Sequence, residues 1–477
     1  MSRLACGLER LPLLKRVRQS ATAVWAISSL FLFIDTFLYS LTVANLPDIL
    51  QSQMHVSQSS NGVITTVFGI GSVIGALASG MPSDRLGFRW PFQLLAAVLY
   101  TVAGIVFYFS QHYYHLLLFR LINGVASGVA CTMLYTTVGD VFPADLLGFK
   151  VAIIIFCNNI AYTTGPICGQ RLFELHGLRG TASIVIAFGV VEAALLLTIG
   201  AESLTVRKIL SERAKMAESP AMKPRFTSTL SSQPSSAEDM SHKCTRVLDS
   251  DAAGFACDHP NISSATEEDG SARMPVWRLL VQLPVLVSTL AIFVATCIQC
   301  TLEALVPLHM SDYFNRSGGT GITFVIFGLA LTILAPLTGK ANDWLIEKYG
   351  NDVRYYVMLF GSVATIFAIL TMALASSYTV MMVGYVFLAL CNLCMYIPAQ
   401  SAYGELVNCT ETNAMAQSCS ISVCAWALGA IAMPPIGSAL YSTSGFTKPI
   451  IGLSTSACIL CAAACLIHPT RKLVARM

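Results

Sequence analysis

A chain of 477 residues in which only 12% are charged has about half the charge density of an average soluble domain. Such a chain has too few charged side chains to cover a water-facing surface, which argues against a soluble enzyme. The net charge of +3 comes from 29 basic and 26 acidic residues, without the basic stripe of a nucleic-acid-binding protein. With 55% hydrophobic residues, the composition favours a membrane protein that is no enzyme and binds no nucleic acid.

Long apolar runs recur along the chain. A helix needs about 20 apolar residues to cross a hydrocarbon core roughly 30 Å thick. Applied to this sequence, that rule predicts twelve transmembrane helices. They lie near Thr22–Val43, Gly62–Ser79, Pro91–Phe109, Leu116–Val138, Gly148–Gln170, Thr181–Gly200, Leu283–Leu305, Gly321–Gly339, Tyr355–Ala375, Val380–Tyr403, Met415–Leu440 and Ile450–Ile467.

A polar segment separates the sixth predicted helix from the seventh. It is rich in Ser, Ala, Pro and charge, as in the stretch TSTLSSQPSSAEDMS, and has too little apolar surface to offset the entropy of ordering. We therefore predict an N-terminal six-helix bundle over 1–200, a disordered cytosolic linker over 201–275 and a C-terminal six-helix bundle over 276–477. The linker is a plain tether or, alternatively, a phosphorylation target.

The distribution of Lys and Arg predicts the orientation. With the long central segment discounted, the side that holds both termini carries 14 of these residues and the opposite side carries 4. Positive charge accumulates on the cytoplasmic side of membrane proteins, so both termini are predicted to be cytosolic.

The two halves of the chain repeat a loop motif. The loop after the second predicted helix reads GMPSDRLGFR, and the loop after the eighth begins GKAND. Gly80 and Gly339 are 259 residues apart, as are Asp84 and Asp343, and the same offset places Lys348 opposite Arg89. This spacing predicts two pseudo-symmetric bundles of six helices.

The acids of these loops are predicted to cap a helix N-terminus or to pair with a basic residue of the other half. Contacts of this kind form in one conformation and break in another, so they set a conformational equilibrium. The predicted conformational gate consists of Gly80, Asp84, Arg85, Gly87, Arg89, Gly339 and Asp343.

Twelve helices divided six plus six, with the pattern GxxxDRxGxR after the second, resemble the major facilitator superfamily. The stretch AYTTGPICGQ in the fifth predicted helix resembles the antiporter signature GxxxGPxxGG and retains Gly165, Pro166 and Gly169. The resemblance implies an all-α secondary transporter in which a bend at this signature seals the proton path. The alternative is an ordinary kinked helix.

Further stretches narrow the resemblance. Phe33–Tyr39 and Thr301–Pro307 are similar to the first and seventh helices of drug:proton antiporters, which include vesicular amine transporters and fungal metabolite exporters. Glu405 matches an acidic position in the tenth helix of the amine transporters, and Arg120–Gly124 resembles the RxxxG signature. Phe68 stands about where the amine transporters carry a lysine, which favours a related exporter over an amine carrier.

Ionisable residues inside the predicted helices, or just beyond one in the case of Glu405, are the candidates for proton and substrate coupling: Asp35, Glu303, Arg120, Glu192 and Glu405. A charge inside a bilayer is costly, so a functional role is the default interpretation. The structural alternative is hydrogen bonds between helices for Asp35 and a solvated helix end for Glu303. For Arg120 it is an ion pair, and for Glu192 it is contact with Asn, Tyr or backbone partners. By resemblance, Arg120 assists a proton relay beside the first helix.

The predicted function is a proton-coupled transporter that exports a small amphipathic organic molecule, a drug or secondary metabolite. A proton symporter that imports a small nutrient and a transporter-like sensor are the alternatives. No nucleotide-binding loop, cofactor or metal site is predicted, and Asn315 is a predicted glycosylation site on the outer side. The expected partners are cargo, protons and lipid. A monomer suffices, in the plasma membrane or, alternatively, a vesicular or vacuolar membrane.

Overall fold

The computed structural model describes residues 20–43, 49, 60–142, 146–199, 282–314, 320–410 and 415–476. The chain divides into two compact units, of which one consists of Met1–Val206 and Ala272–Met477. The other, Arg207–Ser271, lies outside the described residues, as does the predicted linker over 201–275. The division into two bundles and a linker therefore stays a prediction.

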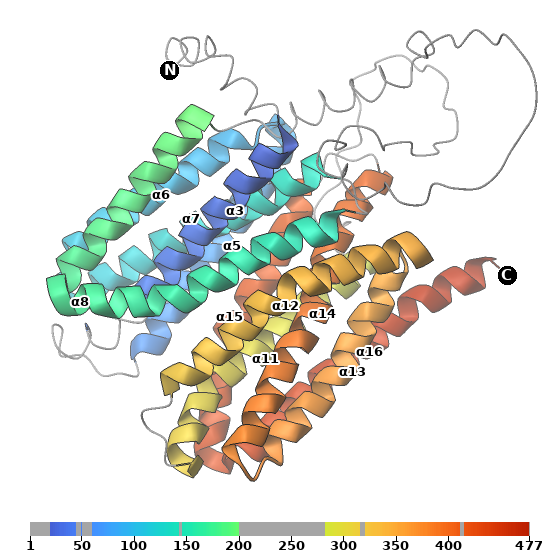
Figure 1. Cartoon of the computed structure of the whole chain (residues 1–477). Coiled ribbons are helices and arrows are strands. Elements are labelled where there is room, and N and C mark those ends of the chain that lie inside the picture. The colour runs from blue at the N-terminus through green and yellow to red at the C-terminus, as the bar shows by residue number, and fades with distance from the viewer. Residues whose placement is uncertain are drawn as a thin grey trace, which may run out of the picture. The chain divides into compact units, whose positions relative to one another are not determined.

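The described residues form helices and no strands (Figure 1). Eleven of these helices are long and apolar enough to cross a membrane, which confirms the predicted all-α polytopic fold. In the first half of the chain they are α3 (Ala21–Val43), α5 (Ser60–Leu86), α6 (Trp90–Tyr108), α7 (Tyr113–Val141) and α8 (Leu147–Ile199). In the second half they are α11 (Leu283–Phe314), α12 (Thr320–Tyr349), α13 (Val353–Ala373), α14 (Tyr378–Thr410), α15 (Met415–Ser444) and α16 (Thr447–Arg476).

Helix α8 accounts for two of the predicted crossings. A straight helix of its 53 residues would be roughly 80 Å long, more than twice the thickness of the hydrocarbon core. The backbone leaves the helical region at Gly177, where φ is 62° and ψ is −160°. Figure 1 shows the two parts of α8 running in different directions from this bend. The predicted helices near Gly148–Gln170 and Thr181–Gly200 lie on either side of it.

Turn glycines occupy equivalent places in the two halves. Gly87 lies between α5 and α6 with φ of 66°, and Gly350 lies between α12 and α13 with φ of 86°. Both angles fall in the left-handed region, which glycine adopts without steric penalty. The repeated motif, predicted to be a loop, lies mostly within α5 and α12 instead, and in each half the helix that carries it ends in the same kind of turn.

Small residues bring helices of the two halves into close contact. A Cβ atom on Gly80 of α5 would lie 2.8 Å from the side chain of Ser420 in α15. In the same way, a Cβ atom on Gly339 of α12 would lie 2.2 Å from the side chain of Ala152 in α8. The two predicted gate glycines therefore let α5 pack on α15 and α12 pack on α8 with no room for a larger side chain.

Candidate functional site

Asp84 joins the two halves of the chain. One of its carboxylate oxygens accepts a hydrogen bond from the backbone N–H of Ala416 at 3.1 Å, and the other accepts one from Gln417 at 2.8 Å. These N–H groups belong to the first turn of α15, where backbone donors have no partner within the helix. Asp84 of α5 therefore caps α15, a negative charge at the positive end of a helix dipole.

Arg89 connects Asp84 to α7. Its Nη1 lies 2.8 Å from a carboxylate oxygen of Asp84, and its Nε donates to Asp140 at 3.0 Å. All three side chains are buried. Burial alone would lower the pKa of Arg89, but the charges of Asp140 and Asp84 outweigh burial and raise it above the ordinary value. Arg89 thus keeps its charge at physiological pH.

Asp84 pairs with Arg89, a basic residue of its own half of the chain. From the sequence we expect a basic partner from the other half. Arg85, although adjacent to Asp84, is exposed. Asp140 was not among the predicted residues. Its only signal was an acid at the end of an apolar run, and nothing in the sequence showed that Arg89, 51 residues away, would reach it.

The second half repeats the capping contact of Asp84. A carboxylate oxygen of Asp343 in α12 accepts a hydrogen bond of 2.6 Å from the backbone N–H of Phe149, in the first turn of α8. The predicted counterpart of Arg89 is wrong, because Lys348 lies over the rings of Trp344 and Tyr349, 5.1 Å from each centroid. Arg354 is the buried basic residue whose charge acts on Asp343. Helix α12 continues six residues past Asp343, whereas α5 continues only two past Asp84, and this difference shifts the offset between the halves.

Asp35 is the centre of a buried polar cluster formed by α3, α6 and α7. One carboxylate oxygen accepts a hydrogen bond from the hydroxyl of Tyr100. The other accepts from the hydroxyl of Ser127 at 3.2 Å and the thiol of Cys131 at 3.3 Å. Only 5% of Asp35 is exposed, so this carboxyl group depends on protein donors in place of water.

Glu192 lies beside this cluster. It comes from the second part of α8, is 2% exposed, and is close enough to Asp35 for the two charges to interact. Its Oε2 has no hydrogen-bond partner among the described residues. Two neighbouring buried carboxylates repel each other when both are ionised, so the pair favours holding a proton. The structure thus brings two of the five predicted coupling residues together.

Arg120 lies on α7 two turns from Ser127 and is 1% exposed. The centre of its guanidinium group is 5.6 Å from the ring centroid of Tyr39, 5.9 Å from that of Phe68 and 5.3 Å from that of Phe119. None of its three nitrogens has a hydrogen-bond partner in the described part of the chain. Arg120 therefore lies beside the first transmembrane helix, as the resemblance implies, but it does not pair with Asp35.

The residues of the antiporter signature form a contact with α3. A Cβ atom on Gly165 would lie 1.9 Å from the Oγ of Ser40, and one on Gly169 would lie 2.3 Å from the carbonyl oxygen of Leu41. Pro166 lies between them inside α8. These glycines hold the first part of α8 directly against the helix that carries Asp35.

A hydrogen bond also crosses between the halves near the Asp35 cluster. The hydroxyl groups of Tyr135 in α7 and Tyr396 in α14 are hydrogen-bonded to each other. Asn392, one turn earlier in α14, donates to the carbonyl oxygen of Ala295 in α11 at 3.0 Å. Polar contacts therefore extend from the Asp35 side of α7 into the second half.

Three predicted residues have no described side chain. Glu303 lies within α11 and Glu405 within α14, but their side chains are outside the described part of the structure. Asn315 falls in the undescribed interval 315–319. Their predicted roles stay predictions.

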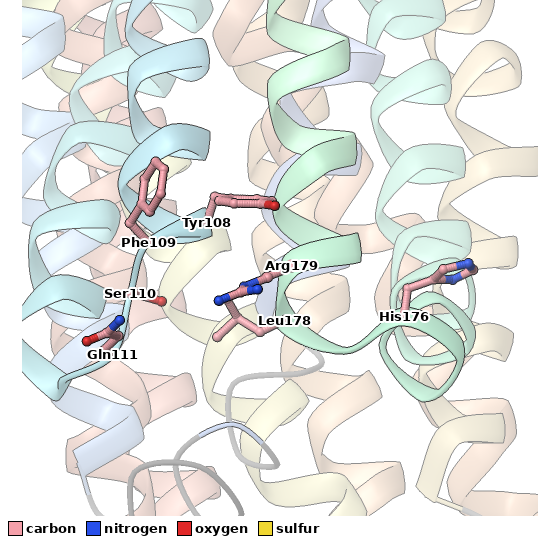
Figure 2. A pocket seen from close by; sticks show the side chains of 7 residues that line it. All are labelled: Tyr108, Phe109, Ser110, Gln111, His176, Leu178 and Arg179. Atoms are coloured by element: carbon pink, nitrogen blue, oxygen red, sulfur yellow. The ribbon is translucent and has the colours of Figure 1, made fainter.

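A surface pocket of about 550 Å³ contains none of the predicted site residues. It lies where α6 ends and α8 bends (Figure 2), and the guanidinium of Arg179 is 5.9 Å from the ring centroid of Tyr108 there. The other residues that line it are Phe109, Ser110, Gln111, His176 and Leu178. The buried cluster around Asp35 is thus a separate feature.

The sequence model of the Major Facilitator Superfamily matches residues 28–416 of this chain, with a second match over residues 290–476. The chain belongs to the Major Facilitator Superfamily. This superfamily consists of transporters that move small-molecule cargo across a lipid bilayer, so the chain is a multi-pass membrane transporter.

Relatives within the superfamily have diverse names. The MFS-type transporter ppzB of Metarhizium majus (strain ARSEF 297) is 23% identical over 443 residues, covering 88% of this chain and 82% of ppzB. A shorter stretch, 30% identical over 99 residues, matches the D-xylose transporter of Levilactobacillus brevis and covers 21% of each chain.

Two solved structures share the superfamily fold. The human organic anion transporter MFSD10 (TETRAN) has a TM-score of 0.65 at 17% identity, covering 94% of this chain and 99% of its own. The proton:xylose symporter XylE has a TM-score of 0.63 at 15% identity, covering 93% and 94%. At these identities the likeness concerns the fold alone.

Proposed function

We propose that this superfamily member exports a small amphipathic organic molecule, a drug or secondary metabolite, in exchange for protons. One observation carries the proposal: two neighbouring buried carboxyl groups, Asp35 and Glu192, lie inside the helical bundle. A buried carboxyl group binds and releases a proton at far lower energetic cost than it holds an unpaired charge. The retained Gly165-Pro166 element of the antiporter signature supports exchange.

In the proposed mechanism, Asp35 alternates between two protonation states as the transporter opens to each side. The three donors Tyr100, Ser127 and Cys131 stabilise the ionised carboxylate and so favour release of the proton. Burial of Asp35 acts in the opposite direction and favours the neutral, protonated group. These opposed influences make Asp35 responsive to small changes in its surroundings.

We propose that the two capping contacts form the conformational gate. Asp84 holds α15 to α5, and Asp343 holds α8 to α12, so each contact joins the two halves of the chain. Opening at this end requires both caps to break. The distribution of Lys and Arg supports assigning this end of the protein to the cytosol. In this proposal both termini are cytosolic, and the protein lies in the plasma membrane.

Import remains the competing direction. XylE is by its title a proton:xylose symporter, and the relative from Levilactobacillus brevis is by name a D-xylose transporter. A proton-binding carboxyl pair serves either direction, because the sign of coupling depends on when cargo and proton bind. The experiment therefore has to determine direction as well as coupling.

The test is uptake into inside-out vesicles of known orientation with an acidic interior, using a panel of aromatic metabolites and drug-like compounds. We expect uptake that depends on the pH gradient and is lost in Asp35→Asn, while exchange of labelled for unlabelled cargo persists. Glu174→Gln, which removes an exposed carboxylate of the surface pair with Arg171, is the matched control and should transport normally. Gradient-dependent uptake by Asp35→Asn would refute the assignment, and uptake driven by an acidic exterior would establish symport.

A further inference from the structure

The guanidinium group of Arg120 is a buried charge for which the described structure provides no counter-charge. None of Nε, Nη1 and Nη2 has a hydrogen-bond partner in the described ranges, although the side chain is 1% exposed. Arginine carries five N–H donors and stays charged in proteins, so it cannot escape this situation by losing a proton. An unpaired buried charge destabilises a protein strongly, which makes its persistence informative.

Asn123 lies one turn further along α7 and shows the same deficit. Both its amide nitrogen and its amide oxygen lack a partner among the described residues, and it is 1% exposed. Residues three apart on a helix lie on the same face, so Arg120 and Asn123 present their unused donors to one region. A deficit shared by two adjacent polar side chains indicates a missing ligand better than one isolated residue would.

The surroundings of Arg120 define the body of that ligand. Aromatic rings of Tyr39, Phe68 and Phe119 lie within 6 Å of the guanidinium carbon and soften its burial through cation–π attraction, but they accept none of its N–H donors. Phe119 also belongs to a buried apolar cluster with Phe107 and Leu116. The region combines a forked cationic donor with apolar walls.

We infer that Arg120, assisted by Asn123, binds the carboxylate group of an organic cargo whose remaining body is apolar. This inference rests on the proposed transport function, because a fully buried Arg120 becomes accessible only in a conformation in which the helices around it separate. A carboxylate matches the planar guanidinium fork with two parallel hydrogen bonds, which a neutral or cationic group cannot do. Asp35 does not substitute for the cargo, because its oxygens already accept hydrogen bonds from Tyr100, Ser127 and Cys131.

The test measures equilibrium binding to the purified full chain in lipid nanodiscs at equal pH on both faces. The probes share one ring system and differ only in charge: 2-naphthoate, 2-naphthamide and 2-naphthylmethylamine. We expect the wild type to bind the carboxylate at least about tenfold more tightly than the amide, and the amine most weakly. Arg120→Gln should reduce the ratio of carboxylate to amide affinity to about one.

Further variants separate recognition from folding. Arg120→Lys keeps the charge but not the planar fork, so it should retain only part of the preference, and Asn123→Ala should weaken carboxylate binding with less effect on the amide. Arg171→Gln, which removes an exposed arginine, should leave all three affinities unchanged. If Arg120→Gln does not fold, the ratio of carboxylate to amide affinity in Arg120→Lys and in Asn123→Ala tests the inference instead.

The inference is overturned if the wild type binds carboxylate and amide equally, if it prefers the amine, or if the Arg120 variants keep the wild-type ratio. Its failure is distinct from that of the proposed function, because binding is measured without a gradient. Naphthoate binding without gradient-driven uptake would refute proton-coupled export and leave the recognition site standing. Gradient-driven uptake of amines alone would support proton-coupled export and refute the carboxylate site.

Discussion

Substitution of Asp84 by asparagine should open the gate. The carboxylate accepts two backbone hydrogen bonds from α15, at 3.1 and 2.8 Å, and pairs with Arg89 at 2.8 Å. Asparagine keeps one acceptor oxygen but presents an N–H₂ group to the second backbone N–H of α15, which then has no acceptor. Arg89 keeps its ion pair with Asp140. Loss of about one hydrogen bond to a charged group destabilises the closed arrangement by about 2–3 kcal/mol, which shifts the equilibrium roughly 30- to 150-fold.

The measurement is the distance between spin labels attached at Phe88 and Tyr349, which are exposed beside the two gate loops. We expect the distance distribution of Asp84→Asn to gain a longer component that is minor in the wild type. Arg85→Gln is the matched control, because it removes an exposed charge next to Asp84 and should leave the distribution unchanged. An unchanged distribution in Asp84→Asn, or an equal shift in Arg85→Gln, would refute the assignment of Asp84 as a gate residue.

Three further predictions concern other parts of the molecule. Asp343→Asn removes the acceptor at the N-terminus of α8, so we expect the same lengthening of the label distance, and no change there would restrict the gate to the first half. Glu192→Gln removes the second buried carboxyl group, so gradient-driven uptake should fall about tenfold or more while exchange of cargo persists; undiminished uptake would leave Glu192 a structural role. Gly124→Ala would place a Cβ atom 2.1 Å from a backbone carbonyl oxygen of α5 and should lower stability by about 1–3 kcal/mol, measured by thermal unfolding. Gly452→Ala, which meets no atom within 4 Å, is its control, and equal melting of the two variants would contradict this reasoning.

The helices could be predicted from the sequence because each is set by a local property. A run of about 20 apolar residues satisfies the bilayer wherever its neighbours lie, and Gly177 permits a break that the polar residues around it favour. The capping role of Asp84 was also predictable, since an acid beside a helix N-terminus is stabilised by that end. That α15, more than 330 residues later, supplies this N-terminus was not predictable, because no local pattern encodes which helices meet.

The partners of the buried charges were harder to predict for the same reason. Tyr100 reads as an ordinary residue of an apolar helix, and only its hydrogen bond to Asp35, 65 residues away, shows its role. The offset of 259 residues identified Asp343 correctly as a capping acid but pointed to Lys348 as the buried base. Arg354 takes that place because α12 runs further past its acid than α5 does, and an offset holds only as far as the two segments match in length.

The described side chains reveal a division between what the two halves share and what they do not. Both halves place an acid at the end of their second helix, and in both this acid caps a helix of the other half. Among the described coupling residues, the buried ones, Asp35, Glu192 and Arg120, all belong to the first half, while the side chains of Glu303 and Glu405 in the second half lie outside the described residues. The two equivalent capping contacts fit a motion in which the halves separate and come together again. Binding of cargo and protons instead requires a particular arrangement of charge. The repeated motif is therefore informative about motion, and the unrepeated residues are where cargo specificity has to be sought.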